Sequence, residues 1–144
     1  MIGIVIVAHG GLAREYLAAV EHVVGAQDGI RAISIEAEHD RAAKQREICD
    51  AADIVDHGEG VVIVVDMFGG SPSNLSLRAC QPENRRILYG ANLPMLIKLA
   101  KSRHLPVPEA VRAALEAGRK YIDSQNIPPG RDMGPGAGEG DNPR

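Results

Sequence analysis

The amino-acid sequence predicts an α/β fold: a mostly parallel, open sheet with helices on both of its faces. Two runs carry this prediction, IGIVIVAHGG at residues 2–11 and VVIVVDMFGGSPSN at residues 61–74. Each begins with an almost unbroken apolar stretch, which is typical of strands that helices cover on both sides. Strand-like and helix-like segments also alternate along the chain, as they do in parallel sheets with right-handed crossovers.

The first half of the chain contains three strand signals and two helix signals. A strand at residues 2–7 is followed by a helix at 12–24, whose apolar residues recur at helical spacing and which ends at Gly25. A short strand at 32–35 precedes a helix that Asp40 caps and that runs to about residue 55. The strand at 61–65 is the most apolar of all.

The second half begins with a helix at 72–80, followed by a short strand at 86–89. Helices follow at 93–102 and 107–117, and Gly118 is expected to end the second of them. Residues 120–122 are compatible with a short edge strand or with a frayed helical turn. The chain after residue 125 is dominated by Gly, Pro and charged residues, so we expect a folded domain at 1–125 and a disordered tail at 126–144.

Composition excludes several function classes. The chain has 144 residues, a net charge of −3 and no dense Lys/Arg cluster, so nucleic acid is a poor partner. Its first apolar run is too short to span a membrane and no basic region precedes it, so we expect a cytoplasmic protein without membrane insertion. Cys49 and Cys80 lack any metal-ligand spacing and are expected to be reduced thiols.

His9 and Asp66 are the candidate catalytic residues, because each ends one of the two apolar runs. If those strands are neighbours, an imidazole and a carboxylate meet at the carboxyl edge of the sheet, where ligands of such folds bind. A carboxylate on one ring nitrogen leaves the other nitrogen unprotonated and available as a nucleophile. The alternative role of Asp66, capping the turn after its strand, is compatible with this one.

The segment after Asp66 predicts an anion site. Ser71 is a natural N-cap and Pro72 suits the first helical position. The free N–H groups of Ser73 and Asn74, with the Ser71 hydroxyl, then form an anion site at the positive end of a helix. We therefore expect a phosphoryl group carried on His9. The residues expected to contact the phosphate are Gly10, Gly70, Ser71, Ser73 and Asn74.

Absent motifs narrow the chemistry. The chain has no GxxxxGK[ST] loop, no GxGxxG and no carboxylate cluster suited to magnesium, so no cofactor and no metal is expected. A phosphohistidine needs neither ATP nor metal when its donor is another phosphoprotein. Met67 and Phe68 beside the site are equally compatible with burial and with a docking surface for a partner.

Three strings, VIVAHGGLA, VVDMFGGSPSN and GANLPML, resemble the mannose-type enzyme IIA domain of the phosphoenolpyruvate-dependent sugar phosphotransferase system. The resemblance implies that His9 accepts phosphate from the phosphohistidine of the carrier HPr and passes it to a IIB component. It further implies that Asp66 orients His9, that Ser71 donates to the phosphoryl group, and that residues 92–95 lie near the site.

The same resemblance implies a homodimer in which an antiparallel edge strand is exchanged, with residues 120–122 as the candidate strand. Two other functions stay open. One is a stand-alone regulatory IIA protein whose phosphorylation state controls a partner. The other is the phosphotransfer subunit of dihydroxyacetone kinase, against which the GGSP element at residues 69–72 argues.

Overall fold

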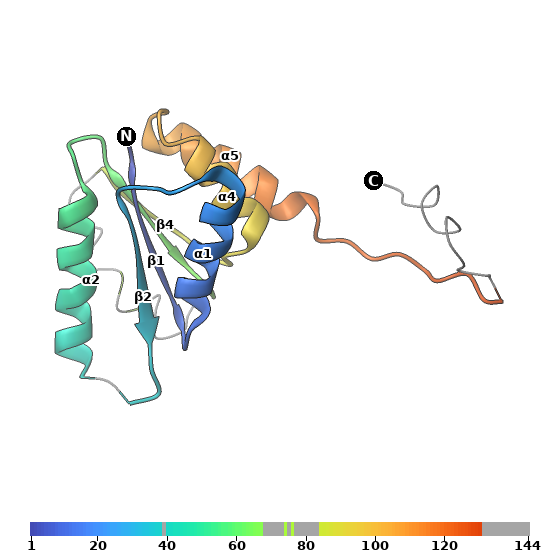
Figure 1. Ribbon diagram of the computed structural model, residues 1–144, viewed down its shortest axis with the longest axis horizontal. Helices are drawn as coiled ribbons and strands as arrows, with labels where there is room; N and C mark the ends of the chain where they lie inside the picture. Colours follow the sequence, from blue (N-terminus) through green and yellow to red (C-terminus); the bar gives the residue numbers. More distant parts are fainter. Residues whose placement is uncertain (39, 68–73, 75, 77–83, 131–144) are drawn as a thin grey trace.

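A parallel sheet forms the centre of the computed structural model, which describes residues 1–38, 40–67, 74, 76 and 84–130. The described strands have the order β2-β1-β3-β4, and every neighbouring pair is parallel (Figure 1). This confirms the predicted parallel α/β sheet. The strands are β1 (Gly3–His9), β2 (Ile30–Ile35), β3 (Val61–Val65) and β4 (Arg85–Leu88).

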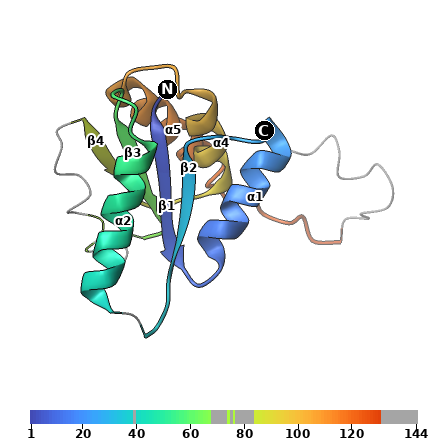
Figure 2. The ribbon, with the colours of Figure 1, turned by 60° about the vertical axis from the view of Figure 1, so that its left-hand side comes forward.

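Helices cover both faces of the sheet, as predicted (Figure 2). One face packs against α1 (Leu12–Val24), α4 (Leu93–Lys101) and α5 (Val107–Lys120), and the other against α2 (Arg41–Val55). Asp40 caps α2 as expected, because its Oδ1 accepts from the N–H groups of Ala42 and Ala43 at 3.0 and 3.3 Å. Gly25 ends α1 with a φ of 89°.

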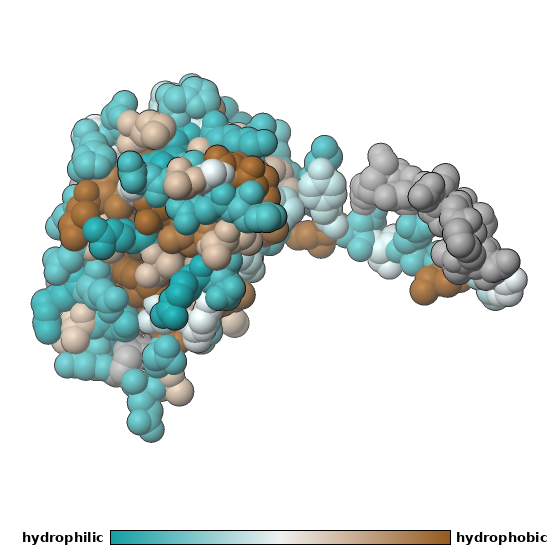
Figure 3. Space-filling model, in the orientation of Figure 1, coloured by the Kyte–Doolittle hydropathy of each residue, from teal (hydrophilic) through white to brown (hydrophobic). Residues whose placement is uncertain are grey.

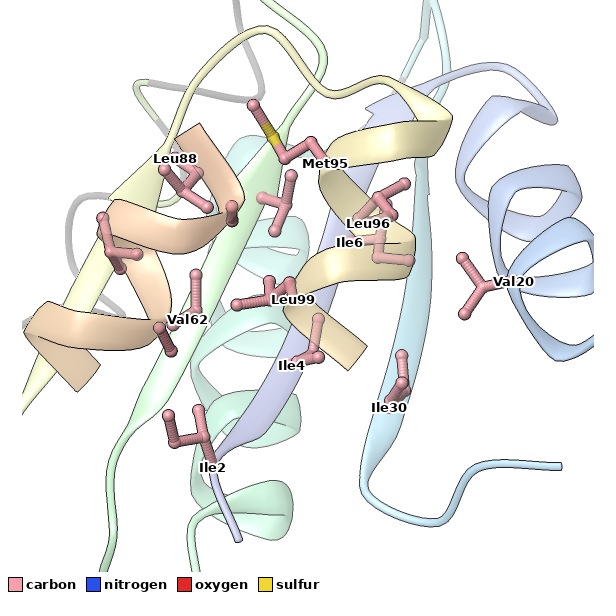
Figure 4. Close-up of a cluster of buried hydrophobic side chains, with 14 of the residues drawn as sticks. Ile2, Ile4, Ile6, Val20, Ile30, Val62, Leu88, Met95, Leu96 and Leu99 are labelled. Atoms are coloured by element: carbon pink, nitrogen blue, oxygen red, sulfur yellow. The ribbon is translucent and has the colours of Figure 1, made fainter. Parts of the chain in front are cut away.

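Alternating side chains of the central strands build two separate cores. In β1, Ile4 and Ile6 point to the face of α1, α4 and α5, while Val5 and Val7 point to α2. Figure 4 shows the first core, where Leu96 and Leu99 of α4 pack over the strands. Both faces of β1 and β3 are thus buried, which explains why their sequences are continuous apolar runs.

Strand β1 is longer than the prediction of residues 2–7. Ala8 and His9 continue the ladder with Ser34 and Ile35 of β2, so His9 is the last residue of the strand. This extension matters for the site, because a residue in the ladder has a fixed backbone.

The predicted end of the last helix was wrong. Gly118 does not follow the helix but lies buried inside α5, which continues to Lys120. A Cβ atom at this position would lie 3.0 Å from the Cβ of Met95, so the glycine allows α5 to pack closely against α4. Close packing of α5 against α4, and not the end of a helix, explains the glycine at this position.

Lys120 closes α5, whereas Tyr121 and Ile122 belong to neither a helix nor a strand of this chain. The exchange of this segment between two subunits requires a second chain and stays a prediction. Among the described residues, no helix combines the length and the apolar character needed to cross a membrane.

Candidate active site

The candidate site lies where the strand order reverses. The chain passes from β1 outward to β2, and then returns to place β3 on the opposite side of β1. The carboxyl ends of β1 and β3 therefore border the crevice in which ligands of open α/β sheets bind. His9 is the last residue of β1, and Asp66 directly follows β3.

Asp66 holds both the backbone and the ring of His9. Its Oδ2 accepts from the backbone N–H of His9 at 3.0 Å and lies 2.9 Å from the Nδ1 of the His9 ring. The pairing of Val7 with Val65 sets this arrangement, because it brings the first residue after β3 alongside the end of β1. The expected meeting of the imidazole and the carboxylate is therefore observed.

This geometry decides which nitrogen of His9 is free. A carboxylate oxygen accepts hydrogen bonds, so its position 2.9 Å from Nδ1 favours the tautomer with the proton on Nδ1. Nε2 then keeps its lone pair. The side chain of His9 is 50% exposed while that of Asp66 is 12% exposed, so the acid is shielded and the imidazole is accessible.

The turn after His9 needs glycine at its first position. Gly10 has a φ of 55°, a left-handed conformation that side chains disfavour, and its N–H donates to the carbonyl of Ile35 at 3.0 Å. The chain then enters α1 at Gly11, which provides no side-chain cap. The first N–H groups of α1, with the positive end of its dipole, thus follow His9 by three residues.

Tyr16 adds a second polar group close to Asp66. Burial raises the pKa of the Tyr16 hydroxyl, and the negative charge of Asp66 raises this pKa further. The hydroxyl donates to the carbonyl of Ala91 at 3.1 Å. Oδ1 of Asp66 is buried and has no hydrogen-bond partner among the residues that the structure describes.

The loop between β4 and α4 forms a fixed wall beside these groups. The N–H of Ala91 donates to the carbonyl of Val65 at 3.0 Å, directly before Asp66. Asn92 caps α4, since its Oδ1 accepts from the N–H of Met95 at 3.0 Å, and its Nδ2 donates to the carbonyl of Gly118 at 2.9 Å. The loop at residues 90–92 is therefore bonded to β3, α1 and α5.

The remaining predicted site residues fall into two groups. Met67 directly follows Asp66 and is exposed, and Asn74 is helical and exposed. The other predicted residues lie outside the described residues: Phe68, Gly70, Ser71 and Ser73.

Sequence reasoning missed Tyr16 as a site residue. Its position in the apolar pattern of α1 predicts a core residue, and Tyr16 does pack against the core. The signal that could have found it is the hydroxyl, which needs a partner once the ring is half-buried. In the described part of the chain, no three His, Cys, Asp or Glu side chains gather in a way that could hold a metal ion.

Comparison with known proteins gives one family. The profile described as PTS system fructose IIA component matches residues 3–116. A curated relative, the PTS system mannose-specific EIIAB component of Escherichia coli strain K12, is 30% identical over 132 residues. That match covers 89% of this chain and 41% of the relative, so the chain spans less than half of the length of that protein.

A second E. coli K12 relative is provisionally named phosphotransferase enzyme IIA component YadI. It is 30% identical over 126 residues, which are 86% of each chain. Among solved structures, the phosphotransferase system component EIIA from Streptococcus agalactiae is 25% identical, with a TM-score of 0.73 over 86% of this chain and 97% of that one.

A second solved structure supports the fold alone. The mannose/sorbose-specific IIA subunit from Enterococcus faecalis is 23% identical, with a TM-score of 0.78 over 88% of this chain and 96% of that one.

The Asp66→Asn substitution is expected to lower the pKa of Tyr16 relative to the wild type, because it removes the negative charge that helps to raise this pKa. Burial remains, so the value stays above the ordinary value of about 10. The protonated hydroxyl contributes stability that is complete below about pH 10 and is lost as the pH rises through the folded pKa.

A pH titration that follows the NMR signal of a Tyr16 ring carbon measures this change in pKa. Asp50→Asn, which removes an exposed carboxylate of α2, is the matched control and should leave the Tyr16 pKa unchanged. An unchanged pKa in Asp66→Asn would show that the two groups do not interact.

Proposed function

The chain belongs to the fructose/mannose-type IIA family of the sugar phosphotransferase system, and we propose that it is a phosphocarrier that holds a phosphoryl group on His9. The observation that carries this proposal is the contact of Asp66 Oδ2 with His9 Nδ1 at 2.9 Å. It supports the tautomer with the proton on Nδ1, which leaves the lone pair on Nε2. In this proposal the donor is phospho-HPr, the acceptor is a IIB component, and all three act in the cytoplasm.

The proposed transfer is a displacement at phosphorus. The lone pair of Nε2 attacks the phosphorus atom of the donor phosphohistidine and forms a nitrogen–phosphorus bond on His9. The donor's nitrogen–phosphorus bond breaks, and its electron pair returns to the donor imidazole. The ring of His9 keeps its Nδ1 proton and becomes cationic, and the carboxylate of Asp66 offsets that charge. Transfer to IIB repeats these steps with His9 as the leaving group, without ATP or metal.

The negative phosphoryl group also needs partners. The first N–H groups of α1, three residues beyond His9, offer the positive end of a helix dipole, worth about 0.3–1 kcal/mol. Ser71, Ser73 and Asn74, with Gly70, are proposed to supply further donors from the segment after Asp66. Gly10 is proposed to contribute through the conformation of its turn and not as a hydrogen-bond donor, because its N–H already donates to the carbonyl of Ile35.

Partner docking is proposed at the apolar rim of the crevice. Leu12 follows His9 by three residues and Met67 follows Asp66 directly, and both are exposed. We propose that these two residues, together with Phe68, offer apolar contact area to a partner protein. HPr and IIB would use this same rim in turn, since both must reach Nε2.

A homodimer is the second part of the proposal. Ile122 is 74% exposed and Ile127 is 85% exposed on the segment that leaves α5, and Figure 3 shows brown, hydrophobic residues along this arm. In the described sheet, β4 is an edge strand. An arm with exposed isoleucines and a described sheet that ends at β4 fit an exchange in which residues 120–122 extend the partner's sheet.

His9→Ala is expected to abolish labelling, because the proposed nucleophile is removed. Wild-type protein incubated with HPr, its upstream kinase and phosphoenolpyruvate should gain one acid-labile phosphate, measured by intact-mass spectrometry at alkaline pH. His22→Ala is the matched control and should be labelled like the wild type. A His9→Ala protein that gains the same phosphate would end the proposal.

Asp66→Asn is expected to slow phosphoryl transfer by roughly 10²-fold or more, measured by rapid-quench kinetics, because an amide facing Nδ1 no longer fixes the tautomer or offsets the ring cation. The side-chain shape is kept, so the melting temperature should change by only a few degrees. Asp50→Asn should transfer at the wild-type rate. A wild-type rate in Asp66→Asn would remove the acid from the mechanism.

Ile122→Asp is expected to shift the protein from dimer to monomer, because a charge on the proposed exchanged strand opposes pairing. Light scattering after size exclusion measures the mass, which for the wild type should be twice that of one chain. Ile54→Asp places the same charge at an exposed isoleucine of α2 and should leave the dimer intact. A monomeric wild-type protein would contradict this part of the proposal.

A further inference from the structure

A hollow lies apart from His9 and Asp66, on the outer surfaces of α4 and α5. These two helices pack side by side on the same face of the sheet (Figure 1). The hollow between them is open to solvent and has a volume of about 1120 Å³. We call it the α4–α5 hollow.

The rim of the α4–α5 hollow is basic. Lys98 and Lys101 of α4 line it together with Arg119 and Lys120 at the end of α5, and among the described residues Glu116 is the one acidic side chain in the lining. The described residues provide no ion pair for these four cations. Because the whole chain has a net charge of −3, this local excess of positive charge is opposite in sign to the protein as a whole.

The floor of the hollow is apolar and made largely of short side chains. Ile97 and Pro94 contribute from α4, and Ala113 and Ala117 contribute from α5. All four are partly exposed. Two alanines on one helix face allow the backbone of a partner to approach closely, and the isoleucine offers apolar area to bury.

We propose that the α4–α5 hollow docks a short amphipathic helix with acidic flanks on a partner protein. Apolar side chains of that helix would cover the floor, and its Glu or Asp residues would meet the basic rim. Both walls of the hollow are helices, whose backbone groups are bonded internally, so a partner strand would find no edge to extend. A helix in a groove is the recognition mode that two helical walls with an apolar floor favour.

The size of the hollow limits the docked segment. The nine residues of α4 extend about 13 Å at 1.5 Å per residue, which matches two to three turns of a partner helix. A hollow of this length suits a rod better than the flat surface of a membrane. Four cations are also fewer than the six to ten phosphate contacts that typical DNA-binding proteins make.

Docking in the hollow uses none of the groups of the proposed phosphoryl transfer. His9 and Asp66 do not line the hollow. The surface therefore suits a partner that stays bound while His9 is phosphorylated and dephosphorylated.

The probe for this surface is a labelled peptide of about 14 residues, with Leu at helical i, i+3, i+4 and i+7 spacing and Glu elsewhere. Fluorescence anisotropy should show saturable binding to the full chain that weakens as salt is added. Lys98→Glu/Lys101→Glu should weaken binding by at least tenfold. In the wild type, amide shifts on peptide addition should be confined to α4 and α5, with His9 and Gly10 unmoved.

The matched control is Arg41→Glu/Arg46→Glu, which makes the same change in net charge on exposed residues of α2. It should bind the peptide like the wild type. Equal weakening by the two double variants would show an effect of net charge alone and overturn the proposal. A scrambled peptide of the same composition that binds equally well would also overturn it.

Two further outcomes would overturn the proposal. Binding to phosphatidylglycerol vesicles without binding to the peptide would assign the surface to a membrane. If the wild type does not bind the peptide and Lys98→Glu/Lys101→Glu loses the dimer, the hollow would be assigned to a second copy of the chain. Labelling of His9 should stay at the wild-type level in this variant, so failure here is distinct from failure of the phosphocarrier proposal.

Discussion

One carboxylate oxygen sets the geometry of the site. Oδ2 of Asp66 contacts both the backbone N–H and the ring Nδ1 of His9, at 3.0 and 2.9 Å. This double contact is possible only because β1 and β3 are parallel neighbours in one register. Register, backbone position and ring orientation are therefore linked, and a slip of β3 by one residue would move the acid to the other face of the sheet.

The fold could be predicted largely from apolar patterns, because the buried strands and amphipathic helices dominate the sequence. The bounds of α1 and β3 were predicted as observed, and Asp40 was correctly expected to cap α2. Gly118 was misassigned because a glycine that ends a helix and one that admits a neighbouring helix look alike in sequence. The difference lies in Met95, which is distant in sequence and contacts Gly118 only in the folded chain.

The site was predictable where residues end strands, since the edge of a parallel sheet brings such residues together. His9 and Asp66 are in this class. Tyr16 is in another, because its partner Ala91 is set by the packing of α1 over the sheet. The resemblance placed residues 92–95 near the site, but the bond of Asn92 to Gly118 depends on the packing of α5. Hydrogen bonds across 26 to 75 residues leave no local pattern. The segment after Asp66, where several phosphate contacts are proposed, lies outside the described residues.

The loop at residues 90–92 links the end of α5 to the candidate site. Asn92 bonds to the carbonyl of Gly118 in the last turns of α5, while Ala91 bonds to Val65 beside Asp66. Fraying of that helix end would remove the anchor of a wall of the crevice, so the two regions share one local stability. The end of α5, where the chain leaves the sheet and its helices, is thus linked to the proposed site through one loop.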